Sequence, residues 1–176
     1  MTKEIEESTI NFIKMKQNLT SAYYISQCFE KTRLRIVEEQ LFTKLRNFAQ
    51  ESGYIFESDS SPKKLQFSFK KSEWENLNIY FFFSGVSTDG VYENFASTIK
   101  LEDSQKEPHQ KLRALLEPLS PYGQVYSFLW GDIIEGKYKD WDLSVFNEIL
   151  DSPDELVNLI IGYVKRLSGL IERYEG

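Results

Sequence analysis

The sequence predicts an α+β fold in which an antiparallel sheet of about four strands, arranged as a meander, is flanked by amphipathic helices. Apolar residues recur at spacings of three and four over residues 33–52 and again over 153–171, which predicts two helices. Over residues 54–101 the apolar period changes to two, and the connections are too short for helical crossovers, which predicts the meander. The length of 176 residues fits a single domain spanning 1–176.

This domain is expected to begin with a helix and a connection in residues 1–30. Apolar residues scattered among polar ones over 3–17 predict a short amphipathic helix, whereas 16–26 is rich in Asn, Thr and Ser and is expected to be a connection. The helix over 33–52 has one apolar stripe, and Gly53 is expected to end it. The members of that stripe are Leu34, Val37, Leu41, Leu45 and Phe48.

The strand meander over residues 54–101 follows. It starts at Tyr54, and residues 65–69 alternate between apolar and polar, as in a strand with one solvated face. Residues 77–83 are apolar at nearly every position, which predicts an inner strand covered on both faces. The Asp89-Gly90 pair favours a hairpin turn before a further strand around 95–101.

The C-terminal region, residues 110–176, is expected to contain a helix, a short aromatic strand and two further helices. We expect the first helix over 110–117 and the added edge strand over 126–130. Asp142 or Ser144 is expected to cap a short helix that runs to Leu150. Ser152 and Pro153 are typical of the start of a last, longer helix.

The charge distribution narrows the class of partner. The formal net charge of −6 argues against a general nucleic-acid binder, which usually carries a basic face. Residues 31–71 nevertheless hold nine bases and five acids, and residues 131–176 hold ten acids and five bases. These clusters are read first as solvated faces; the alternatives are a basic patch for an acidic partner, or an acidic face that imitates phosphate.

Residue types that carry chemistry are scarce, so we expect no enzyme and no catalytic, cofactor-binding or metal-ligating residue. Cys28 is the only cysteine and is expected to be buried; His109 is the only histidine and is expected to be exposed. The one Glu-x-Lys, at residues 135–137, has its nearest upstream acid only three residues away, which is too close for a magnesium nuclease site. The lone thiol and the absence of an apolar leader or a membrane-length apolar run predict a cytoplasmic protein with no membrane partner.

The candidate partner-binding residues are therefore aromatic and charged. The tryptophans are expected to pack at the edges of the core. The alternative is that they are partly exposed and bind a partner, since Trp is enriched in interface hot spots. The lysines with a tryptophan would hold a nucleic-acid backbone and stack a base. The candidates are Trp74, Trp130 and Trp141, then Lys63, Lys64, Lys70 and Lys71, and the acids Asp140 and Asp142.

The order of segments resembles the C-terminal, non-catalytic region of bacterial PD-(D/E)xK nuclease superfamily proteins. The matching stretches are residues 34–54, 67–83 with Trp74, 126–130, and 141–171. The nuclease half with its Asp and acid-x-Lys is missing from this sequence, so no catalytic residue carries over. The resemblance implies a free-standing relic of the non-catalytic part.

Together these features predict a non-enzymatic module that binds a protein. A phage or mobile-element inhibitor, or a regulator of a host defence or nuclease system, is one setting for such a module. The alternatives are a nucleic-acid-associated accessory protein, an acidic nucleic-acid mimic and an unrecognised enzyme. The oligomeric state is left open.

Overall fold

The structure of the chain is a computed structural model that describes residues 3–61, 64–74, 77–87, 90–101, 125–126 and 129–175. The predicted α+β class is confirmed. The helix expected over 110–117 lies outside the described residues, as do His109 and Lys63.

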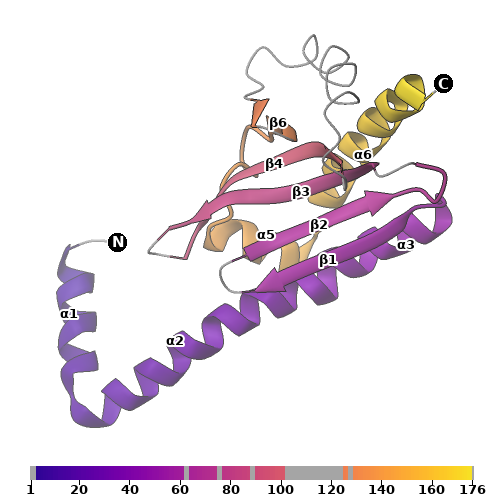
Figure 1. The fold of residues 1–176 in the computed structure, drawn as a ribbon. Helices are drawn as coiled ribbons and strands as arrows, with labels where there is room; N and C mark the ends of the chain where they lie inside the picture. Colours follow the sequence, from indigo (N-terminus) through magenta and orange to yellow (C-terminus); the bar gives the residue numbers. More distant parts are fainter. Residues whose placement is uncertain are drawn as a thin grey trace.

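Within these residues the strands form one six-stranded sheet in the order β1-β2-β3-β4-β6-β5, and all neighbouring strands are antiparallel (Figure 1). The first four strands make the predicted meander. Beyond β4, the expected edge strand over 126–130 takes the form of two short strands. The bounds are β1 Ile55–Ser61, β2 Lys64–Lys70, β3 Leu77–Val86, β4 Tyr92–Leu101, β5 Val125–Tyr126 and β6 Leu129–Ile133.

The helices confirm two expectations and correct one. The helix over the predicted range ends at Glu51 with Ser52 as its C-cap, just before Gly53, which has a φ of 72°. The last helix runs far beyond Pro153. Both outcomes agree with the predictions. The connection expected over 16–26 is wrong, because these residues lie in a helix that continues without a break to Glu51. The bounds are α1 Lys3–Lys14, α2 Lys16–Ile36, the π-helical η1 Val37–Phe42, α3 Thr43–Glu51, α5 Leu143–Asp151 and α6 Asp154–Glu175.

The polar residues of 16–26 favour a connection in sequence, yet there is a physical reason why they are helical in the structure. Propagating an existing helix costs far less than nucleating one, so polar residues can extend the helix that begins in 33–52. This extension does not pack against the sheet, and therefore needs no continuous apolar stripe. None of the helices in the described stretches combines the length and apolar character needed to cross a bilayer.

The core lies on one face of the sheet, beneath α3, α5 and α6 (Figure 1). Phe67, Phe81 and Phe95 from three neighbouring strands form its centre, and the Phe67 and Phe81 rings stack with centroids 4.9 Å apart. In η1 the adjacent residues Leu41 and Phe42 are both fully buried, which the wider turn of a π-helix allows. The chain therefore commits most of its aromatic residues to packing.

The opposite, outer face of the sheet is only partly covered. Tyr80 and Phe82 on β3 are half-buried there and stack with ring centroids 5.8 Å apart. Lys100 on β4 places its Nζ 5.1 Å from the centre of the Tyr80 ring. Strand β3 thus has neighbours on both sides as predicted, but its outer face is not fully enclosed.

The start of α5 is fixed by an N-cap. Asp142 is the cap residue, and its Oδ1 accepts hydrogen bonds from the backbone N–H of Ser144 at 2.8 Å and of Val145 at 3.3 Å. The Ser144 hydroxyl also donates to this carboxylate and, as the largest cause, holds the pKa of Asp142 below its ordinary value. One of the two predicted caps is therefore confirmed.

Replacing Asp142 with alanine is expected to lower the free energy of unfolding by about 1 kcal/mol, because two backbone donors of α5 lose their acceptor. Chemical denaturation at pH 7 measures this. Asp142→Asn is the matched control, since asparagine caps as well as aspartate but carries no charge. An equal loss in both variants would show that the charge, and not the cap, stabilises the helix.

Candidate functional site

The two tryptophans whose side chains are described are core residues. Trp141 is fully buried and its Nε1–H donates to the backbone oxygen of Tyr138 at 3.1 Å. Trp74 is 3% exposed and packs edge-on against Tyr54, with ring centroids 5.9 Å apart. Trp130 lies in β6, where its backbone pairs with Ile99, and its side chain is outside the description. Neither Trp74 nor Trp141 offers a surface to a partner.

The predicted basic set is divided between different parts of the surface. Lys64 pairs with Asp59 at 2.5 Å, and Lys70 lies on the outer face of the sheet by its register. Lys71 instead turns toward α6, where its Nζ lies 2.8 Å from a carboxylate oxygen of Glu172. That hydrogen bond is the main reason why the pKa of Lys71 is raised and that of Glu172 lowered. Of these lysines, Lys71 lies over the buried Trp74, with its Nζ 5.7 Å from the ring centroid, whereas Lys64 and Lys70 lie elsewhere on the surface.

The acidic candidates have structural roles. Asp140 accepts a hydrogen bond from the backbone N–H of Asn94 at 2.8 Å, and Asn94 itself has a positive φ of 54° in β4. Asp142 caps α5 as described above. Each carboxylate is thus directed at a backbone donor of its own chain.

The described side chains of the Glu-x-Lys stretch make ion pairs within this chain. Lys137 Nζ contacts carboxylates of Glu148 at 3.0 Å and Glu155 at 2.8 Å, whereas Glu135 lies 3.9 Å from Lys139. Among the described residues, no three His, Cys, Asp or Glu side chains gather in a group that could hold a metal ion.

Tyr138 and Glu148 form a hydrogen-bonded pair near this stretch, and the pKa of each is shifted. Burial raises the pKa of Tyr138 to about 12, so its hydroxyl stays protonated and donates to Glu148. This hydrogen bond is the largest cause that lowers the pKa of Glu148. A carboxylate with a depressed folded-state pKa adds stability above its unfolded pKa, and loses that contribution as the pH falls through its folded pKa.

Tyr138→Phe is therefore expected to lower the free energy of unfolding at pH 7, and the deficit should shrink as Glu148 becomes protonated in acid. Urea denaturation of both proteins at a series of pH values from 7 to about 3 measures the difference. A deficit that is independent of pH would mean that Tyr138 acts by packing alone.

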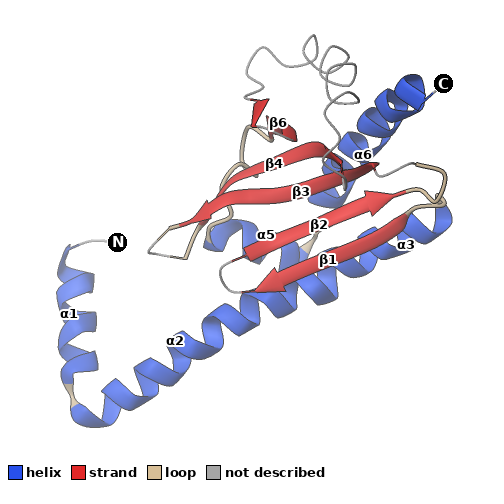
Figure 2. Cartoon of the chain, viewed as in Figure 1, coloured by secondary structure: helices blue, strands red, loops and turns tan. Residues whose placement is uncertain are grey.

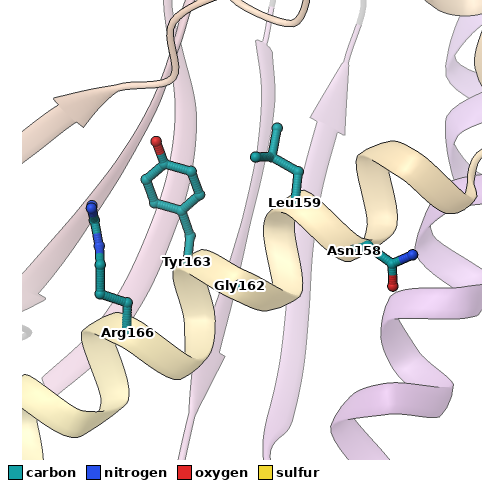
Figure 3. A pocket seen from close by; sticks show the side chains of 5 residues that line it. All are labelled: Asn158, Leu159, Gly162, Tyr163 and Arg166. Carbon is teal, nitrogen blue, oxygen red and sulfur yellow. The ribbon is translucent and has the colours of Figure 1, made fainter.

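One shallow hollow of about 350 Å³ lies along α6 (Figure 3). A Cβ added at Gly162 would meet nothing within 4 Å, so this glycine leaves the helix surface indented. Leu159, Tyr163 and Arg166 project to one side of the helix and Asn158 to the other, and Arg166 lies 4.7 Å from the centre of the Tyr163 ring. These described lining residues come from a single helix and do not converge on a point, unlike the polar groups of a ligand site.

The most unusual surface of the molecule is the arm, by which we mean residues 3–32 of α1 and α2. Figures 1 and 2 show α2 running out from beneath the sheet and α1 turning back from it at Met15. Of the twelve exposed large hydrophobic side chains among the described residues, eight lie on this arm. They are Ile10, Phe12, Met15, Leu19, Tyr23, Tyr24, Ile25 and Phe29.

Cys28 also lies on the arm and is exposed, so its predicted burial is wrong. The expectation of a connection over 16–26 hides this surface in the sequence. The run Tyr23-Tyr24-Ile25, three large apolar residues in a polar setting, is the feature that could have indicated it.

The arm joins the body of the protein at Arg33. This guanidinium is buried, donates to the backbone oxygen of Gly90 and lies over the rings of Phe29, Tyr92 and Phe146 at 5.1, 5.7 and 5.4 Å. One residue thus ties α2 to the β3–β4 connection and to α5. The base of the arm is therefore packed against the body, while most of its other described side chains are exposed.

No family model, curated protein or solved structure matches this chain. The resemblance to nuclease tail regions therefore stays a prediction.

Proposed function

We propose that this chain is a non-enzymatic protein-interaction module and that the arm is its binding element. The observation that carries the proposal is the concentration of eight exposed large hydrophobic side chains on α1 and α2. A concentration of exposed apolar side chains on one segment favours an interaction site, and aromatic residues such as those on the arm supply much of the energy of protein interfaces.

The energetics favour a protein as the partner. Removing a large apolar side chain from water contributes about 1.5–3 kcal/mol, so a partner that covers several arm residues gains a substantial driving force. The four lysines of the arm are matched by four glutamates, so it offers no row of bases for a phosphate backbone. If the nuclease-tail resemblance is homology, a component of a defence or nuclease system is the first class of partner to test.

The test is capture of proteins from a lysate of the natural host by the tagged chain, with and without nuclease treatment, followed by mass spectrometry. We expect a stoichiometric protein that resists nuclease and is lost with Leu19→Gln. Leu143→Gln is the matched control, because Leu143 on α5 is 56% exposed and Leu19 is 57% exposed. Capture that disappears with nuclease, or that Leu143→Gln abolishes and Leu19→Gln does not, would contradict the proposal.

A further inference from the structure

One face of the exposed part of α2 has the spacing of a coiled coil, with large apolar residues at Leu19 and Phe29. Alternating steps of four and three residues lead from Met15 to Arg33, where the same face of the helix enters the core. We call this face the seam; its members are Leu19, Ala22, Ser26, Phe29 and Arg33 of α2, together with Met15, the N-cap residue just before α2. The three large members beyond the body, Met15, Leu19 and Phe29, are 55, 57 and 44% exposed.

We propose that the seam pairs with the seam of a second copy of this chain, with the two α2 helices antiparallel and related by a two-fold axis near Tyr24. This rests on the proposed function and names the partner. Two helices with the same heptad spacing can pack their seam side chains between one another, as knobs into holes. Because the two copies are related by a two-fold axis, a contact from residue i to residue j also occurs from j to i. Leu19 of one copy then faces Phe29 of the other, and Ala22 faces Ser26.

The residues that flank the seam at its centre are apolar, as this arrangement requires. Tyr23 flanks one side and Ile25 the other, and they are 61 and 69% exposed. In an antiparallel pair each flank lies beside the same flank of the other helix, so each of these residues meets its own counterpart near the axis. A parallel pair would instead set Ile25 beside the charged Glu30.

Charge complementarity supports the same orientation. Lys16, Tyr23 and Glu30 follow one another at intervals of seven residues and hold equivalent positions on one flank of α2. A two-fold axis near Tyr24 brings position 16 of one copy opposite position 30 of the other. The pair thus gains two reciprocal contacts between opposite charges, one at each end.

The apolar area supplies more than half of what a standard dimer interface buries. At 150–250 Å² for a fully covered large side chain, the exposed fractions of the five large residues on and beside the seam amount to roughly 500 Å² per copy. A standard protein interface buries about 800 Å² per partner. The polar residues beside the seam therefore need to bury only the remaining area.

Light scattering coupled to size-exclusion chromatography, with sedimentation equilibrium for the Kd, tests the proposal by charge exchange on the full chain. Lys16→Glu alone and Glu30→Lys alone are each expected to weaken the dimer about tenfold or more, because both reciprocal contacts then join like charges. An equimolar mixture of the two variants is expected to form a heterodimer of near wild-type affinity, as is the doubly exchanged Lys16→Glu/Glu30→Lys homodimer. Leu19→Gln should weaken the dimer and Leu143→Gln should not.

Circular dichroism melts verify that each variant folds. A wild-type chain that stays monomeric at about 100 μM, far above the Kd of a standard-size interface, overturns the proposal. If the chain dimerises but the charge variants and their mixture have the same Kd as the wild type, the antiparallel pairing is overturned. A monomer that still captures another protein through Leu19 refutes self-association and leaves the proposed function intact; a monomer that captures nothing refutes both.

Discussion

Replacing Trp141 with alanine is expected to lower the free energy of unfolding by about 3–5 kcal/mol. The side chain is fully buried, and its indole lies 5.0 Å from the ring of Phe83, 5.2 Å from Phe95 and 6.2 Å from Phe146, measured between ring centroids. Its backbone N–H donates to the Tyr92 oxygen at 2.8 Å, so the same residue joins α5 to the sheet. Urea denaturation followed by far-ultraviolet circular dichroism measures the loss.

Trp141→Phe separates packing from hydrogen bonding. Phenylalanine keeps a ring among its neighbours but cannot donate to the Tyr138 oxygen, so we expect a loss clearly smaller than that of Trp141→Ala. If Trp141→Ala cost less than about 1 kcal/mol, the indole would not be the core residue described here.

Gly90→Ala is expected to have the second large effect, at the junction of arm and body. Gly90 has a φ of 76°, which costs an L-residue about 1–2 kcal/mol. An added Cβ would also lie 2.8 Å from Nη2 of Arg33, so the buried guanidinium would have to move away from its aromatic contacts. The total loss in unfolding free energy should therefore exceed the backbone cost alone.

Gly53→Ala provides the matched control, because Gly53 has a similar φ of 72° but no atom within 4 Å of an added Cβ. The difference between the two variants isolates the conflict with Arg33. In an Arg33→Ala background this difference should vanish, which a double-mutant cycle measures. Equal losses for Gly53→Ala and Gly90→Ala would mean that Arg33 adapts without cost.

The body of the fold was predictable because its elements bury apolar residues at regular intervals. The stripe from Leu34 to Phe48 marks the helix beneath the sheet, and the alternation through Phe67 marks a strand with one core face. The cap at Asp142 is a local interaction, and local interactions are visible in sequence. These features depend on neighbours within a few residues.

The candidate site was not predictable in the same way. A tryptophan in sequence looks alike whether it plugs a core, as Trp74 and Trp141 do, or faces a partner. Lys70 and Lys71 are adjacent in sequence, yet one lies on the outer face and the other turns toward Glu172. Whether Tyr23 is exposed depends on how far α2 extends beyond the sheet, which tertiary structure alone decides.

Because the helix from Lys16 to Glu51 is unbroken, a movement of the arm is transmitted to the part of the helix beneath the sheet. At 1.5 Å per residue, its free part before Arg33 is about 25 Å long, while its other end is packed into the core through η1 and α3. A force applied near Leu19 is therefore transmitted as torque to Leu41 and Phe42 rather than absorbed by a hinge within α2. Each single-residue insertion just before Val37 would turn the arm by about 100° about its own axis, redirecting its apolar face without altering any residue on it.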